Sequence, residues 1–107
     1  MIKRYYKNFE IYKNKNGITG VLYCRDEEKK DWYEIIENEK IGDDEIAVLI
    51  YKNEIVDITK DLSTLFPSNV FEVIILKGKY KWLKRNIIIE IKNNDIYFIK
   101  DLEVERL

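Results

Sequence analysis

The sequence predicts one small β-rich α+β domain, covering residues 1–107, with about seven or eight short antiparallel strands and one short helix near residues 59–66. Three observations support this prediction. The chain has eighteen isoleucines and one alanine, and β-branched side chains favour strands over helices. Short apolar runs alternate with turn signals at regular intervals. The length suits a single hydrophobic core. A curled meander that closes like a barrel or a sandwich would protect its strand edges best.

The first elements are expected to form a hairpin. Residues 2–12 alternate apolar and polar positions, and residues 18–24 are expected to pair back on them. Asn16 and Gly17 lie between these runs and can supply the positive φ of a hairpin bend. Beyond the charged connection 25–31, residues 32–39 fit both a helical face and a strand alternation. Their aromatic and β-branched side chains favour a strand.

The middle of the chain predicts a buried central strand over residues 45–51, a turn at 52–54 and a second strand over 55–58. The helical signal follows. Thr59 can act as the N-cap, Asp61 lies in the first turn, and an apolar face is formed by Leu62, Leu65 and Phe66. Pro67 ends this helix after about two turns, because the residue before a proline is pushed out of the α region.

The last third predicts three more strands. They cover residues 70–76, 86–92 and 96–100, and Leu102 and Val104 are candidates to extend the last one. Residues 77–85 form a basic connection, and residues 93–95 form a tight turn. No internal repeat and no linker divides the sequence, so we expect a single domain.

Charge is distributed unevenly, although the formal net charge is only −1. Residues 1–25 carry six basic groups and one acid, residues 26–45 carry ten acids and three lysines, and residues 77–85 carry five basic groups and no acid. Such blocks create local potentials even when the total charge is near zero. The sequence therefore predicts an acidic surface and a separate basic one.

Catalytic chemistry has little support in the composition. The chain has no histidine, so the base for Cys24, Ser63 or Ser68 would have to be a lysine or a carboxylate. We expect Cys24 to be a half-buried structural thiol and the two serines to make local hydrogen bonds. The acids most suited to catalysis or metal binding show no ligand spacing: Asp43, Asp44 and Glu45, and the pair Asp57 and Asp61. We expect no enzyme activity, no metal and no cofactor.

The acidic stretch leads to our main functional hypothesis. A negative face can dock onto a basic groove of another protein, and aromatic side chains within it can anchor the contact. The expected partner-binding residues are Trp32, Tyr33, Glu34, Glu37, Glu39, Asp43 and Asp44. The chain would then be a non-catalytic binding protein that contacts or occludes another macromolecule, such as an inhibitor or immunity-type protein of a phage or mobile element. Alternatively, Trp32 belongs to the core and the charge run is only a solvated face.

The basic connection supports the alternative hypothesis, a small nucleic-acid-binding domain. Lysines neutralise phosphates and aromatic rings stack on exposed bases. The residues concerned are Lys77, Lys79, Tyr80, Lys81, Trp82, Lys84 and Arg85. A structural interpretation competes with it: the aromatics would face the core and the lysines the solvent. The sequence pI of about 5.6 also disfavours a dedicated nucleic-acid binder.

The sequence also bears on location. The longest apolar run, Ile46 to Tyr51, is far shorter than the roughly 20 residues that span a bilayer. The basic residues near the N-terminus are not followed by the apolar region of a signal peptide. A lone cysteine cannot form an internal disulfide and suits a reducing compartment. We therefore expect a cytoplasmic protein with a protein partner and no membrane contact.

Overall fold

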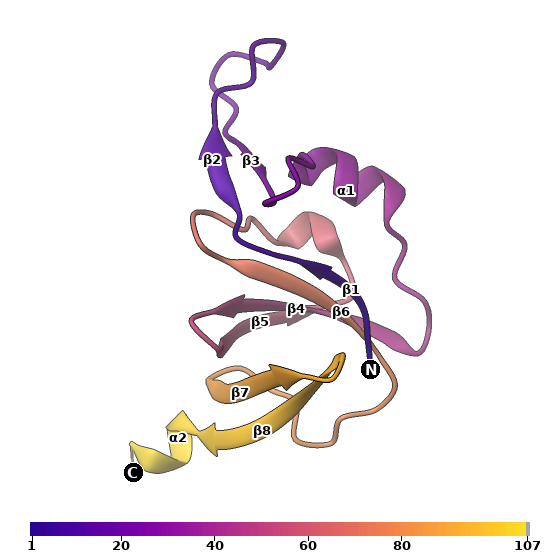
Figure 1. Ribbon diagram of the computed structural model, residues 1–107, viewed down its shortest axis with the longest axis vertical. Coiled ribbons are helices and arrows are strands. Elements are labelled where there is room, and N and C mark those ends of the chain that lie inside the picture. The colour runs from indigo at the N-terminus through magenta and orange to yellow at the C-terminus, as the bar shows by residue number, and fades with distance from the viewer. Residues whose placement is uncertain (107) are drawn as a thin grey trace.

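The computed structural model describes residues 1–106 and confirms the predicted fold class: a small β-rich domain with eight antiparallel strands (Figure 1). Six strands form one sheet in the order β1-β6-β4-β5-β7-β8, and β2 and β3 form a separate hairpin. The strands of the large sheet are β1 (Ile2–Tyr6), β4 (Glu45–Tyr51), β5 (Glu54–Thr59), β6 (Glu72–Lys77), β7 (Ile87–Lys92) and β8 (Asp95–Asp101). The hairpin strands are β2 (Glu10–Tyr12) and β3 (Tyr23–Arg25).

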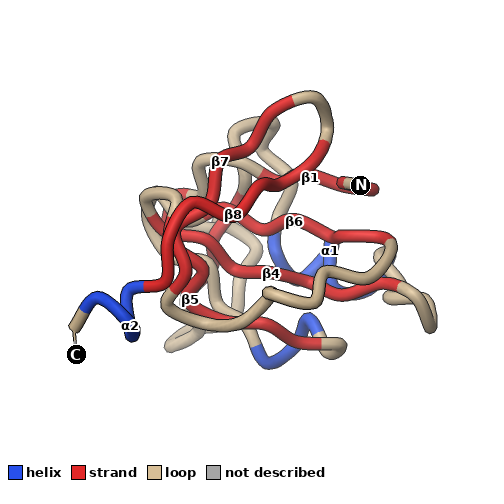
Figure 2. The backbone as a smooth tube through the Cα atoms, turned by 90° about the horizontal axis from the view of Figure 1, so that it is seen from below, coloured by secondary structure: helices blue, strands red, loops and turns tan. Residues whose placement is uncertain are grey.

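The large sheet curls into a half-barrel. Only one residue pair, Glu54 and Ile88, joins β5 to β7 in strand register, so the β7–β8 hairpin can turn away from the plane of the other strands. At one end the two edges of the sheet meet, because the backbone N–H of Ile2 donates to the carbonyl of Asn94 at 2.8 Å. Figure 2 shows the turn between β7 and β8 beside the N-terminus. The strand order is only partly that of a meander, since β6 lies between β1 and β4.

The two faces of the sheet carry separate apolar cores. Alternate side chains of a strand point to opposite faces, so Ala47 and Leu49 enter one core, and Val48 and Ile50 enter the other. The outer core lies under the helical segments and also holds Phe9, Cys24, Trp32, Ile35, Leu62, Leu65, Val73 and Ile75. The inner core lies within the curl and also holds Ile2, Ile55, Ile74, Leu76, Ile87, Ile89 and Ile96. The central strand β4 is buried on both sides, as its sequence predicts.

The strand predicted over residues 32–39 is wrong, because Trp32–Asn38 form the helix α1. The Asp31 side chain caps this helix by accepting a hydrogen bond from the backbone N–H of Tyr33 at 2.8 Å. Trp32 and Ile35 share the buried side of α1. Glu34 follows Asp31 by three residues, the spacing of a capping box, and this signal indicates a helix start that the strand propensity of the segment conceals.

Three further segments differ in detail from the prediction. The apolar run 2–12 forms two strands, because Asn8 has a φ of 51° between them. In the segment 59–66, only the 3-10 turn η1 (Leu62–Thr64) is helical, and its N-cap is Asp61, not Thr59. Residues Leu102–Glu105 form the short helix α2 and do not extend the last strand.

Two of the predicted turns have the expected backbone conformation, and a third has its positive φ at another residue. Lys52–Asn53 and Asn93–Asn94 all have positive φ, which is the conformation of tight two-residue hairpin turns. The loop between β2 and β3 differs from the prediction, because positive φ belongs to Gly20 and not to Asn16 or Gly17. Gly17 is required for another reason: a Cβ atom there would overlap the ring of Tyr23.

Candidate functional site

The β2–β3 hairpin projects from one end of the molecule as an arm (Figure 1). Its loop carries three apolar side chains at the surface, with Ile18 72% exposed, Leu22 61% exposed and Val21 39% exposed. These side chains lie in one turn, since the backbone N–H of Val21 donates to the carbonyl of Ile18 at 3.1 Å. Exposed apolar side chains gathered at one place are typical of interaction surfaces. We call Ile18, Val21 and Leu22 the arm tip.

Tyrosine side chains join the arm tip to helix α1. The hydroxyl of Tyr23 accepts a hydrogen bond from the backbone N–H of Ile18 at 2.8 Å, and the Tyr33 hydroxyl donates to the carbonyl of Leu22 at 3.1 Å. The rings of Tyr23 and Tyr33 pack edge to face with their centroids 5.4 Å apart. The arm tip therefore lies beside the exposed side of α1, where Tyr33 is 39% exposed.

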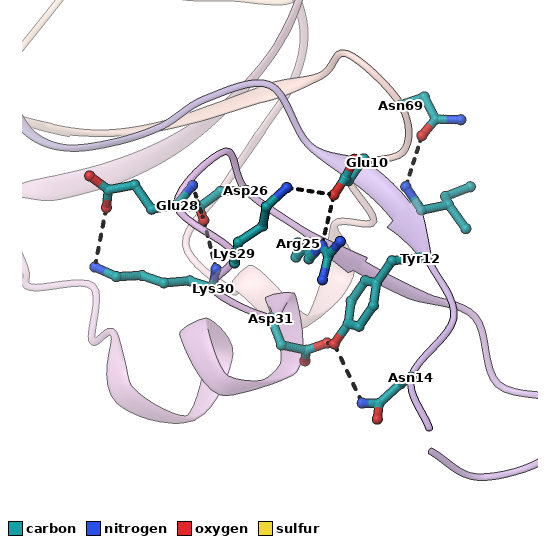
Figure 3. A network of polar contacts seen from close by, with 11 residues as sticks. Glu10, Tyr12, Asn14, Arg25, Asp26, Glu28, Lys29, Lys30, Asp31 and Asn69 are labelled. Atoms are coloured by element: carbon teal, nitrogen blue, oxygen red, sulfur yellow. Dashed lines mark hydrogen bonds and ion pairs between the residues drawn. The ribbon is translucent and has the colours of Figure 1, made fainter. Parts of the chain in front are cut away.

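Polar contacts brace the base of the arm (Figure 3). The Tyr12 hydroxyl donates to the carboxylate of Asp31, the residue that also caps α1. On the other strand, Arg25 Nε donates to Glu10 Oε1 at 2.7 Å, and Lys29 Nζ reaches the same oxygen at 3.1 Å. The Arg25 guanidinium also lies 4.5 Å from the centroid of the Tyr12 ring. These contacts hold the arm in one orientation relative to α1.

The groups that brace the arm keep their protonation states at neutral pH. Burial, together with the neighbouring Asp31 carboxylate, raises the pKa of the Tyr12 hydroxyl to about 12, so this group stays a hydrogen-bond donor. Hydrogen bonds from Arg25 and Lys29 lower the pKa of Glu10, so this carboxylate stays ionised. Neither group therefore changes its protonation state near neutral pH.

Residues of the predicted acidic surface lie partly in the core and partly at the surface of the molecule. Trp32 is 1% exposed, packs edge to face on Phe9 and donates from its indole nitrogen to the Leu65 carbonyl at 2.9 Å. It therefore belongs to the core, which was the alternative interpretation of this residue, and cannot offer its ring to a partner. The residue beside it, Tyr33, takes the exposed position that the sequence hypothesis assigned to both aromatics.

The acids of the predicted surface have different environments. Glu39 accepts a hydrogen bond from the Tyr6 hydroxyl at 2.8 Å and lies 3.4 Å from Arg4 Nε, so its charge is used within the fold. Glu34 and Glu37 are exposed on α1 and make no ion pair with any residue from 1 to 106. Asp43 and Asp44 are exposed in the connection before β4, away from the arm tip.

The arm tip and helix α1 together carry part of the predicted site and three residues that are absent from it. We use the name arm face for Ile18, Val21, Leu22, Tyr33, Glu34 and Glu37. Tyr33 contacts the arm tip, and Glu34 and Glu37 are exposed on the same helix, where Glu34 lines a groove with Arg4 and Lys30. The sequence analysis placed residues 18–24 in a strand, whereas the strand begins only at Tyr23. Gly20 within that apolar run is the signal for a loop, because glycine inside a strand pattern weakens it.

The aromatic residues of the basic segment 77–85 face the core, as the structural interpretation of this segment expected. Tyr80, Trp82 and Leu83 are half-buried and pack against the inner core. The Tyr80 hydroxyl donates to Asp95 Oδ1 at 2.6 Å, and the Trp82 ring lies 5.8 Å from the Phe98 ring. The Tyr80 and Trp82 rings are inclined at 78° to each other, so they do not form a flat platform for successive bases.

Two basic side chains of this segment are paired inside the fold. Lys84 Nζ lies 2.6 Å from Asp101, and Arg85 lies 2.9 Å from Asp57. No ion pair within residues 1–106 involves Lys77, Lys79 or Lys81. The charge available to phosphates is therefore smaller than the sequence suggests.

The candidate nucleophiles have structural roles. Ser63 Oγ donates to Asp61 Oδ1 at 2.7 Å, which is the local hydrogen bond expected of this serine. Cys24 is fully buried, and this burial together with the Asp31 charge raises the pKa of its thiol to about 12. Asp61 caps η1, and Asp57 pairs with Arg85. In the described part of the chain, no three residues with acidic, thiol or imidazole side chains gather in a metal-binding arrangement. The helices within residues 1–106 are all too short to cross a membrane.

Comparison with known proteins adds no relative: neither a protein-family model nor a curated protein matches this sequence.

Proposed function

We propose that this protein is a non-catalytic binding protein that contacts or occludes another protein through the arm face. One observation supports this most: exposed apolar side chains gather at the end of a braced, projecting arm that contacts helix α1 through Tyr33. The same helix carries Glu34 and Glu37, which form no ion pair within residues 1–106. A partner that covers the apolar side chains of the tip removes them from water, and this burial favours binding. The contact is local, as in interfaces where a few anchoring side chains carry most of the binding energy.

The bracing of the arm supports a role in binding. A loop that is ordered before binding loses less conformational entropy on association than one that must become ordered. Tyr12, Arg25 and Tyr23 supply this order from inside the arm, and Tyr33 fixes the tip to α1. The tip therefore loses its conformational entropy when the chain folds, and it loses little more when a partner binds.

The charges of α1 define the chemistry of the partner. Glu34 and Glu37 attract a surface with basic side chains and repel an acidic one. The apolar tip requires a depression lined by apolar atoms. The partner that suits both is a protein with an apolar depression bordered by lysine or arginine, such as a groove built for nucleic acid. Occupation of such a groove is how an inhibitor or immunity-type protein from a phage or mobile element would act, and we place this action in the cytoplasm.

A comparison of two variants in the organism that encodes the chain tests this proposal. Affinity-tagged wild-type protein is expected to retain a stoichiometric protein partner, and the double variant Ile18→Ser/Leu22→Ser is expected to lose it. Val104→Ser is the matched control, because Val104 is 63% exposed on α2, far from the arm in sequence. If no stoichiometric partner is recovered, or if the tip variant retains it, the proposal is wrong.

Contact with nucleic acid is the second candidate, supported by Lys77, Lys79 and Lys81, which form no ion pair within residues 1–106. The phosphate contribution to binding is strongest at low salt. Fluorescence anisotropy of labelled single- and double-stranded oligonucleotides at low salt, compared with the triple variant Lys77→Gln/Lys79→Gln/Lys81→Gln, tests it. The absence of binding by the wild type at low salt would exclude this candidate.

A further inference from the structure

A groove with a volume of about 570 Å³ lies at the opening of the half-barrel, and it is separate from the arm face. Its floor is largely apolar and is formed by Ile46 of β4, Ile58 of β5, and Tyr80 and Leu83 of the loop between β6 and β7. The volume falls within the range of about 300–1,000 Å³ typical of ligand sites, and such sites combine an apolar lining with a few polar groups.

One backbone hydrogen bond and two side-chain hydrogen bonds fix the walls of the groove. The backbone N–H of Gly78 donates to the carbonyl of Asp44 at 2.9 Å, which ties the loop after β6 to the start of β4. Lys60 Nζ donates to the carbonyl of Asp43 at 2.8 Å on the other side. The Tyr80 ring is held by its hydrogen bond to Asp95. Three separate contacts therefore hold the walls of the groove, one of them between backbone groups.

The rim of the groove carries charges of both signs. Glu45 and Lys60 line it, but Glu45 is paired with Lys3 and Lys60 Nζ donates to the Asp43 carbonyl. The other charges on the rim belong to Asp43 and Asp44 and to Lys79 and Lys81. None of these four side chains forms an ion pair with a residue between 1 and 106. The acidic and basic blocks, distant in the sequence, thus line one groove and touch where Gly78 contacts Asp44. A ligand with a single sign of charge would be attracted by one part of this rim and repelled by the other.

We propose that this groove binds a peptide segment in which a large apolar side chain lies between a basic and an acidic residue. The apolar side chain would occupy the floor between Ile46, Ile58 and Leu83. The basic residue would face Asp43 and Asp44, and the acidic residue would face Lys79 and Lys81. This arrangement places an opposite charge beside the two aspartates and beside the two lysines, and it removes apolar surface from water. Such complementarity selects one peptide over another.

An NMR titration of the isotopically labelled protein with capped peptides tests the proposal. The probes are two pentapeptides with Lys-Leu-Glu or Glu-Leu-Lys at their centre, because the groove does not set the direction of the chain. At least one of them is expected to shift the amide signals of the groove. Three control peptides, with Lys-Leu-Lys, Glu-Leu-Glu or Lys-Ser-Glu at their centre, are expected to bind roughly tenfold more weakly, through lost charge pairing or lost apolar contact.

A charge exchange makes the test specific. The variant Lys79→Glu/Lys81→Glu changes only exposed side chains and is expected to prefer the Lys-Leu-Lys peptide over the mixed peptides. The arm-face variant Glu34→Lys/Glu37→Lys is expected to bind the mixed peptides as the wild type does, so this inference and the proposed function fail independently. The inference is overturned if millimolar mixed peptide shifts no groove signal, if Lys-Ser-Glu binds equally well, or if the charge exchange leaves the preference unchanged.

Discussion

Replacement of Trp32 tests whether this residue stabilises the core or serves as an interface anchor. Its indole ring is 1% exposed, and its nitrogen donates to the Leu65 carbonyl. Trp32→Phe keeps an aromatic ring against Phe9 but removes the donor from a buried carbonyl. Trp32→Ala removes the ring as well and opens a cavity in the outer core. Both changes are expected to lower the free energy of unfolding, and alanine more than phenylalanine.

The magnitudes follow from these contacts. A buried carbonyl left without its donor costs about 1–3 kcal/mol, which is the expected loss for Trp32→Phe. Truncation of a buried tryptophan to alanine costs about 3–5 kcal/mol. Small domains have a total stability of only about 5–15 kcal/mol, so Trp32→Ala is expected to leave little folded protein in mild urea.

Urea unfolding followed by far-ultraviolet circular dichroism measures these losses. Trp82→Phe is the matched control, because Trp82 is half-buried and its indole nitrogen makes no hydrogen bond within residues 1–106, so its loss is expected to stay below about 1.5 kcal/mol. The core assignment is refuted if Trp32→Phe costs no more than Trp82→Phe. It is also refuted if Trp32→Ala folds with wild-type stability.

Three further predictions concern the surface and the charges. Glu34→Lys/Glu37→Lys is expected to fold with wild-type stability, because both side chains are exposed and neither forms an ion pair with a residue from 1 to 106. The variant is expected to associate more slowly with the captured partner and with a changed salt dependence, and stopped-flow kinetics at two salt concentrations check this. Tyr12→Phe is expected to lose a hydrogen bond to a charged group, worth about 1.5–3 kcal/mol, and to speed amide hydrogen exchange in the arm more than in β4. Hydrogen bonds from the Gly42 backbone and from Lys3 lower the pKa of Glu45 in the folded state, so its stabilising contribution is present above about pH 4.3 and lost as the pH falls through the folded-state value. The urea midpoint of Glu45→Gln is therefore expected to lie below that of the wild type near neutral pH and to approach it in acid, and a constant difference between the two proteins would contradict this assignment.

The strand pattern was the part of the fold that the sequence predicts well, because periodicity and turn chemistry act locally. The run 45–51 is apolar at nearly every position, and burial on both faces accounts for it. The asparagines at 93 and 94 tolerate the positive φ that their turn requires. The order of strands depends on contacts between distant segments, such as the one between Ile2 and Asn94, which no local pattern indicates.

The functional residues were harder to predict than the strands. The acidic stretch is continuous in the sequence, but the fold uses Asp26 and Asp31 to hydrogen-bond backbone N–H groups and Glu39 to pair with neighbouring side chains. Charge counts cannot distinguish such acids from solvated ones. The same limit applies to Trp32 and Tyr33, which are adjacent in sequence and separated into core and surface only because α1 is a helix.

The proposed function depends on contact between the arm face and a protein partner. Hydrogen–deuterium exchange of the chain alone and in the complex recovered from the native organism tests this contact most directly. Slower exchange in the complex is expected over residues 16–23 and 33–37, with segment 77–85 unchanged. Protection confined to segment 77–85, or the same exchange in both states, would contradict it.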